Sequence, residues 1–265
     1  MHNSMHRRQC GDLIYYTCDR LPVRHAFTTK FGGVSQGDCA SLNFGLKRGD
    51  RPENVRRNYE ILAETLDMPL QRFTLTQQVH ESRVQVVEEA DVGTGLSRPM
   101  DWRADALVTA LPDTPLAGFY ADCVVTLFYD PTALVCAVCH SGWRGTAQEI
   151  AAKTVQRMAT LGACRDTIIA VIGPSICQNC FETDADVPEA MQKQMGTSVL
   201  EFIEQRGRKY HVDLQGILQM TLQHAGLRAE NIIHSGLCTK CMSDVFWSHR
   251  ATNGHRGVQA GVICL

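Results

Sequence analysis

Two strand-forming runs joined by a short turn constrain the fold more than any other feature of the sequence. The runs are CVVTLFYD (123–130) and ALVCAVCH (133–140), and the turn between them contains Asp130, Pro131 and Thr132. β-Branched and aromatic residues favour strands, and a proline suits the first central position of a type I turn. The pattern therefore predicts an antiparallel hairpin.

The hairpin brings two metal-ligand types together. If Pro131 and Thr132 form the centre of the loop, Cys123 faces His140. Directly opposed residues point to the same side of a sheet, with Cβ atoms about 4.5–5.5 Å apart, so the thiolate and the imidazole can share a metal ion. Proline cannot adopt the positive φ of the turns that two-residue hairpins prefer, so a longer loop is the alternative.

The remaining periodicity mixes strands and helices without strict βαβ alternation, which favours an α+β fold. Runs rich in Val and Ile predict strands at 105–110, 167–173 and 258–265, and amphipathic spacing predicts helices over 51–68, 187–195 and 213–226. Thr146 and Glu149 have capping-box spacing, which predicts a further helix that ends near Gly162. We expect a single domain over 1–265, with an N-terminal extension and the first strand in 1–23.

Composition and charge exclude several classes of function. The chain has 265 residues, 44% of them hydrophobic, and a formal net charge of -2. Because there is no basic stripe, we expect a small-molecule substrate and no nucleic acid. The N-terminal segment lacks the apolar run of a secretory signal, and the longest apolar runs are only strand-sized, so we expect a cytoplasmic protein without a membrane span.

Six of the twelve cysteines form CxxC pairs. Cys136 and Cys139 lie on one predicted strand an odd number of residues apart, so they face opposite sides and make an unlikely joint clamp. The other pairs are Cys177/Cys180 and Cys238/Cys241. Together they could form a structural four-cysteine zinc site, although the segment between them is far longer than in a zinc finger. The alternative is small packing residues near the active site.

A catalytic zinc ion needs a third protein ligand besides Cys123 and His140. His80, in the turn of TLTQQVHESRV, is the candidate from the pattern. A lone histidine in a loop is more often solvated than a ligand, so both interpretations stay open on spacing alone.

At this point the sequence resembles a known family. The ordered motifs QQVH, ADALVT, ADCVV, CHSGWRGT, IGPSICQNCFE and SHRATNGHRG, together with LNFGLKRGDRPENVRRN, resemble the multicopper polyphenol oxidase (laccase) domain family, also described as purine nucleoside phosphorylase and adenosine deaminase. The resemblance extends from about Arg24 to Leu265. It implies a four-layer αββα sandwich and a catalytic zinc site made by His80, Cys123 and His140.

The family chemistry can be matched to further residues. Zinc lowers the pKa of a coordinated water toward about 7, which suits deamination of adenosine to inosine. Phosphorolysis of adenosine, inosine or 5'-methylthioadenosine to the free base and ribose 1-phosphate needs an anion site. Arg144, before a predicted helix N-terminus, and Arg250 are candidates for it, with surface ion pairs as the alternative. Asn43 could bind ribose hydroxyls, although a turn-forming role suits it better.

Other functions remain open at this level. Copper binds similar thiolate and imidazole donors, so a copper-dependent polyphenol oxidase is one alternative, and peptidoglycan precursor editing is a second. None of the ten histidines forms the HxH pair typical of multicopper oxidases. A non-catalytic thiol or metal-binding module is the alternative from another class. We expect a monomer or homodimer that binds a purine nucleoside and phosphate.

Overall fold

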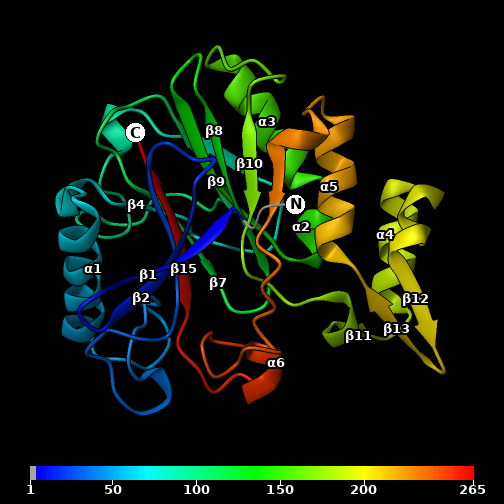
Figure 1. Cartoon of the computed structure of the whole chain (residues 1–265), viewed down its shortest axis with the longest axis horizontal. Helices are drawn as coiled ribbons and strands as arrows, with labels where there is room; N and C mark the ends of the chain where they lie inside the picture. The colour runs from blue at the N-terminus through cyan, green and yellow to red at the C-terminus, as the bar shows by residue number, and fades with distance from the viewer. Residues whose placement is uncertain (1–3) are drawn as a thin grey trace.

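The computed structural model describes residues 4–265, in which two large β-sheets lie face to face (Figure 1). Across the first sheet the strands are β1 (Met5–Cys10), β2 (Leu13–Cys18), β3 (Arg24–Thr28), β15 (Gln259–Cys264), β7 (Leu116–Tyr120) and β4 (Thr74–Leu75). Across the second they are β14 (Ile232–His234), β10 (Ile169–Ile172), β8 (Val124–Asp130), β9 (Val135–Ser141), β6 (Ala106–Thr109) and β5 (Val84–Val86). A small third sheet contains β11 (Glu182–Thr183), β13 (Lys209–Val212) and β12 (Ile203–Arg206).

Helices cover the outer faces of the two large sheets. The α-helices are α1 (Pro52–Leu66), α2 (Trp143–Ala147), α3 (Ile150–Thr160), α4 (Asp186–Met195), α5 (Leu214–His224) and α6 (His249–Thr252). Short 3₁₀ turns are η1 (Gly37–Cys39), η2 (Leu70–Arg72), η3 (Glu89–Asp91), η4 (Gln178–Cys180), η5 (Thr197–Phe202) and η6 (Ala229–Asn231). None of the helices within residues 4–265 is long and apolar enough to cross a bilayer.

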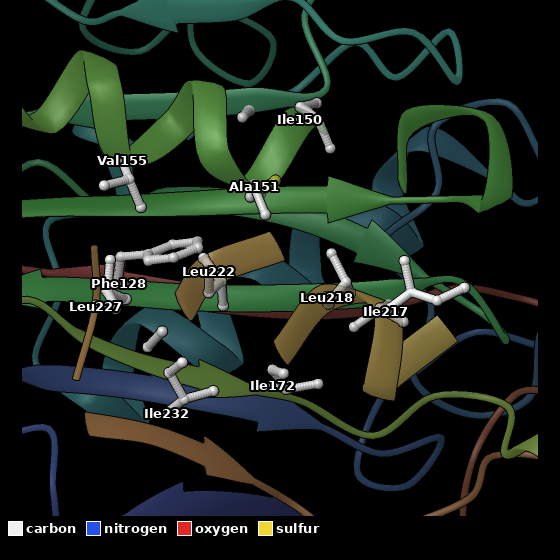
Figure 2. Close-up of a cluster of buried hydrophobic side chains, with 14 of the residues drawn as sticks. Phe128, Ile150, Ala151, Val155, Ile172, Ile217, Leu218, Leu222, Leu227 and Ile232 are labelled. Carbon is white, nitrogen blue, oxygen red and sulfur yellow. The ribbon is translucent and has the colours of Figure 1, made fainter. Parts of the chain in front are cut away.

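Three apolar clusters hold the layers together. Tyr59 of α1 packs with Val262 of the first sheet. Phe27 of the first sheet packs with Leu127 of the second, so this cluster lies between the sheets. On the outer face of the second sheet, residues of α3 and α5 pack on Phe128 (Figure 2). The order is helix, sheet, sheet, helix, which confirms the predicted α+β fold and its four αββα layers, and the core shared by the sheets supports our proposal of a single domain.

The central hairpin is buried on both faces. Every residue of β8 and β9 is buried, and side chains alternate between the two clusters. Cys136 faces the first sheet and Cys139 faces the helices, as the odd spacing predicts. Strands covered on both sides are continuous apolar runs, which explains the composition of this segment.

The predicted register of this hairpin is wrong by two residues. Val125, not Cys123, lies opposite His140, because the loop between Asp130 and Val135 has four residues rather than two. A shift of two keeps every side chain on its predicted face, since the side-chain period of a strand is two. Cys123 therefore stays on the same side as His140, just before β8 begins.

The predicted capping box is also wrong. Two helices replace the single one: α2 ends at Ala147, and α3 begins at Ile150 after Glu149, which has a left-handed backbone (φ 57°) and no side-chain cap hydrogen bond. The predicted end is close to the observed one, because Gly162 supplies a positive φ of 93° just after α3.

The outer core makes a stability prediction. Phe128 is completely buried against α3 and α5, so Phe128→Ala should lower the free energy of unfolding by about 3–5 kcal/mol. Urea denaturation followed by circular dichroism measures the change. Leu200→Ala is the matched control, because Leu200 is 43% exposed and its loss should cost less than about 0.5 kcal/mol. Equal losses in the two variants would contradict the packing.

Candidate metal centre

His80, Cys123 and His140 converge at one end of the central hairpin. Each offers a ligand atom, and these three atoms lie within 4.8 Å of one another. The imidazole rings of His80 and His140 are nearly perpendicular, with centroids 5.0 Å apart. His140 is buried, Cys123 is half-buried and His80 is exposed, so the group opens to solvent on the side of His80. One thiolate and two imidazoles with an open side are typical of a catalytic zinc centre.

Gly142 leaves the space that an ion would need. A Cβ atom at this position would lie 3.0 Å from Cδ2 of His80 and 3.4 Å from Sγ of Cys123. Any larger residue would therefore enter the cradle between the ligands. The donor set and this open cradle both fit a bound metal ion.

Asp105 fixes the orientation of His140. Its Oδ1 lies 2.8 Å from Nδ1 of His140, and its main-chain oxygen accepts the amide of the same residue, also at 2.8 Å. Because a carboxylate accepts, Nδ1 carries the proton and Nε2 is left as the ligand nitrogen. A carboxylate behind a metal-binding histidine is the usual way that proteins set this tautomer.

The same carboxylate holds the loop that carries His80. The amides of Val79, His80 and Glu81 donate to the two oxygens of Asp105 at 2.9, 3.0 and 3.4 Å. His80 has a φ of 60°, a strained conformation for a residue other than glycine. Asp105 thus connects two of the three candidate ligands, because it bonds to the side chain of His140 and to the main chain of the loop that carries His80.

Electrostatics in the group favour a thiolate. Burial opposes ionisation of Cys123, but hydrogen bonds and charge from His140 and His80 outweigh it and lower the pKa of Cys123 to about 6. Burial likewise disfavours the protonated form of His140, yet Asp105 and Cys123 raise its pKa to about 9. Burial also works against the charge of Asp105, but hydrogen bonds from His140 and the loop amides lower its pKa overall. Without a metal ion, Cys123 and His140 therefore form a thiolate–imidazolium pair near neutral pH. A bound ion would take the place of the proton on Nε2 of His140, because ligand groups must be deprotonated.

Asp122 holds the backbone next to Cys123. Its carboxylate accepts from the hydroxyl of Thr239 and from the amide of Arg250, both at 2.6 Å. Its φ of 90° is a conformation that few side chains tolerate. With both carboxylate oxygens bonded within the protein, Asp122 has a structural role at this turn.

The three candidate ligands open into a cavity of about 470 Å³. Its wall is partly apolar, with Phe44, Leu75, Met100, Phe119 and Val258 among the lining residues. This volume is in the range of small-molecule sites. The apolar wall suits a flat ring system, and the polar end of the cavity carries the ligand trio.

Arg256 gives the cavity a buried positive charge. It is 8% exposed, and its Nε has no hydrogen-bond partner within the described residues 4–265. Burial, and then the charge of Arg48, lower the pKa of Arg256 to about 10, so it stays charged at neutral pH. Its Nη1 donates to the main-chain oxygen of Gly257 at 2.9 Å. Because the charged side chain lines the cavity, this part of the wall can attract an anion.

The structure places the predicted substrate-binding residues elsewhere. Arg144 is exposed and packs over the ring of Trp143. Arg250 donates to the main-chain oxygen of Glu182. Asn43 is fully buried, and its amide bonds to Gly45, Asp50 and Val258. Within the described residues 4–265, the cavity is lined by none of these three side chains. Their roles in substrate binding stay predictions.

Sequence reasoning missed Asp105 and Arg256. Asp105 begins the DALVTA run that was interpreted only as a strand, and it lies 35 positions before His140. Arg256 belongs to the motif that drew attention to Arg250. A charged residue at the start of an otherwise apolar strand was the available signal for Asp105, and Arg256 had no comparable one.

The fold and site together define an α+β protein with a Cys/His metal-site geometry at one end of the central hairpin. Residues 24–265 match the family described as multi-copper polyphenol oxidoreductase laccase. The chain belongs to this family, and the resemblance expected from the motifs is confirmed.

Named relatives place the chain in a family of enzymes. It is 36% identical to purine nucleoside phosphorylase YlmD of Bacillus subtilis, with 87% of this chain and 84% of the relative covered. It is 37% identical to a purine nucleoside phosphorylase of Deinococcus radiodurans, covering 92% and 90%. Adenosine deaminase RL5, from an unknown prokaryotic organism, is 35% identical, covering 85% and 87%.

Solved structures show the same fold. Hypothetical protein YfiH of Bacillus licheniformis superposes with a TM-score of 0.92 at 31% identity, covering 98% of each chain. YlmD of Geobacillus stearothermophilus gives a TM-score of 0.89 at 31% identity, covering 97% of this chain and 98% of that one.

Asp105 provides the sharpest test of the geometry. Asp105→Asn keeps the side-chain shape but removes the charge that orients His140 and one acceptor for the loop amides, so metal affinity should fall about 10–100-fold. Competition with a chromogenic zinc chelator measures the affinity. Asp12→Asn, at an exposed position in the β1–β2 turn, is the control and should change nothing. Unaltered affinity in Asp105→Asn would contradict the assigned role.

Proposed function

We propose that the chain is a zinc-dependent purine nucleoside enzyme. It catalyses phosphorolysis of adenosine, inosine and 5'-methylthioadenosine to the free base and ribose 1-phosphate, and it deaminates adenosine to inosine. The metal ligands are His80, Cys123 and His140. Relatives named for phosphorolysis and for deamination both support this combination.

One observation carries the proposal: the ligand trio and the buried, charged side chain of Arg256 line one cavity. A nucleoside and phosphate present an apolar base, a polar sugar and an anion. The cavity offers an apolar wall, polar groups at the trio and a buried cation for these three parts. Complementarity of this kind fits phosphorolysis better than it fits a phenol, which has no anion to bind.

In phosphorolysis an oxygen of phosphate forms a bond with C1' of the ribose while the bond from C1' to the base breaks. Arg256 would hold the phosphate through a charge-assisted hydrogen bond in a desolvated place, where such bonds are strong. The positive charge of Arg256 also stabilises the attacking phosphate close to the sugar. The base leaves with the electrons of the broken bond and takes up the proton that hydrogen phosphate loses on bonding to C1'. The apolar wall keeps competing water away from C1'.

A zinc ion held by the trio would supply Lewis acidity at the open side of the group. Asp105 keeps the proton on Nδ1 of His140, which leaves the other nitrogen free to ligate. Cys123, ionised near neutral pH, contributes the negative charge that a divalent ion needs. These assignments concern how the chain would hold and orient the ion.

Copper binds the same kind of donors, and copper-dependent phenol oxidation is the alternative activity. Within residues 4–265, the potential metal-binding groups are the trio and a set of four cysteines, and the trio alone contains histidine. A multicopper oxidase needs several histidine-rich copper sites. Zinc at the trio is therefore the better proposal, and peptidoglycan precursor editing remains the other alternative.

Product analysis tests the activity directly. Zinc-loaded protein with adenosine should yield inosine and ammonia without phosphate, and adenine with ribose 1-phosphate only when phosphate is present. Chromatography with mass detection identifies each product. Cys123→Ala and His140→Ala should each abolish both reactions while the circular dichroism spectrum stays native. Adenosine left unchanged by the wild type, or nucleoside turnover retained in either variant, would refute the proposal.

Arg256 should separate the two reactions. Arg256→Gln removes the buried charge, so the phosphorolysis rate at low phosphate should fall by a factor of about 100 or more, the scale for losing one charged donor at a reacting centre. Deamination needs no phosphate and should change far less. Steady-state kinetics with varied phosphate measure both activities.

Two arginine variants complete this experiment. Arg157→Gln, at an exposed position in the last turn of α3, is the neutral control. Arg144→Gln tests the residue predicted from the sequence. Loss of phosphorolysis in Arg144→Gln with full activity in Arg256→Gln would return the anion site to Arg144.

A further inference from the structure

A second group of potential metal ligands lies away from the trio. Cys177, Cys180, Cys238 and Cys241 place their four sulfur atoms within 4.8 Å of one another. The first two come from the loop between β10 and η4 and from η4 itself, and the last two from the loop between β14 and α6. Neither the ligand trio nor the cavity includes any of these cysteines.

The two loops lie side by side through main-chain contacts. Ser175 forms a parallel bridge with Cys238. The amide of Ser175 donates to the oxygen of Leu237 at 3.2 Å, and the amide of Thr239 donates to the oxygen of Ser175 at 3.1 Å. The backbone therefore holds the two CxxC segments facing each other independently of any bond between the sulfurs.

Within this arrangement the sulfur of Cys238 is an acceptor. The amides of Cys177 and Cys241 both donate to it, at 3.3 and 3.4 Å. Amide donors that converge on a sulfur are typical of thiolates at metal sites, where hydrogen bonds outside the ligand shell orient and stabilise the ligand. A sulfur buried only as a packing group needs no such donors.

The dimensions suit a tetrahedral ion. With zinc–sulfur bonds of about 2.3 Å, the sulfurs at the corners of a tetrahedron are about 3.8 Å apart. The sulfurs of Cys180 and Cys241 are 3.4 Å apart, and all four lie inside the 4.8 Å limit. A disulfide would join only two sulfurs at about 2.05 Å and gives no reason for four to converge.

We propose that Cys177, Cys180, Cys238 and Cys241 bind a structural zinc ion that ties the β10–η4 loop to the β14–α6 loop. Four thiolates in a closed tetrahedron leave no open position, which distinguishes a structural site from a catalytic one. The inference does not rest on the nucleoside activity.

The proposed ion also supports the first metal centre. The loops that it joins both bond to Asp122, the residue just before Cys123. The amide of Ile176 donates to the main-chain oxygen of Asp122 at 2.9 Å, and the hydroxyl of Thr239 donates to its carboxylate at 2.6 Å. Fixing these two loops therefore supports the turn at Asp122 that precedes Cys123.

Metal counting by plasma mass spectrometry tests the site. The wild type, purified under reducing conditions and loaded with zinc, should hold two zinc ions per chain. Cys177→Ser/Cys180→Ser should hold one, and Cys123→Ala should also hold one. Cys10→Ser/Cys164→Ser is the matched control, because both residues are exposed and lie outside the two groups, and it should keep two. Two zinc ions in Cys177→Ser/Cys180→Ser would overturn the proposal.

A cobalt measurement decides the matter even if the double serine variant fails to fold. Cys123→Ala has no thiolate at the trio, and adding Cys10→Ser/Cys164→Ser removes the two exposed cysteines outside both groups, so charge-transfer absorption with the intensity of four thiolates in this variant comes from the four cysteines. We expect that absorption, with the visible bands of a tetrahedral cobalt ion. Its absence would overturn the proposal, as would bound iron in place of zinc, or a disulfide between Cys180 and Cys241 in protein purified under reducing conditions.

Discussion

The candidate metal centre depends on the carboxylate of Asp105. It lies beside the buried start of β6, accepts from Nδ1 of His140, and accepts three successive amides from the loop that carries His80. The buried negative charge of Asp105 thus orients the ring of His140 on β9. It also fixes the conformation of the loop that carries His80, which lies earlier in the sequence. Burying a carboxylate is costly unless hydrogen bonds compensate it, and here the compensating donors are the candidate ligands themselves or their neighbours.

The third candidate ligand, Cys123, is held by a different set of contacts, which involve its neighbour Asp122. Cys123 follows Asp122, which bonds to Ile176 of the β10–η4 loop, to Thr239 of the β14–α6 loop and to Arg250 of α6. The four cysteines lie on the same pair of loops. The rigid hairpin, the Asp105 network and these loops together bring a thiolate and two imidazoles to the mouth of one cavity, a degree of preorganisation that metal sites require.

Much of this architecture follows from local sequence patterns. The residue patterns of the two hairpin runs, of the helix at 51–68 and of the closing strand each favour one type of secondary structure. The opposite faces of Cys136 and Cys139 follow from strand alternation alone. The register of β8 and β9 did not follow, because Pro131 permits more than one loop length. The split between α2 and α3 arises from a left-handed Glu149, which no propensity predicts.

Long-range partners are the part that the sequence could not supply. Nothing local connects Asp105 to His140, or Arg256 to the trio, because these contacts depend on how distant strands and loops pack. The two CxxC pairs were ambiguous for the same reason, since the distance between them in space is set by the Ser175–Cys238 bridge. Arg144 was chosen because it lies in a glycine-containing turn before a predicted helix, and Arg250 because it belongs to the SHRATNGHRG motif. Burial, which singles out Arg256, is visible only in three dimensions.

The most direct test of the central claim is a crystal structure with phosphate and an unreactive adenosine analogue, with anomalous scattering recorded at the zinc edge. The account predicts an anomalous peak bonded to His80, Cys123 and His140, phosphate against the guanidinium of Arg256, and the purine ring along the apolar wall of the same cavity. A cavity with no metal at the trio, or a nucleoside bound elsewhere on the protein, would contradict it.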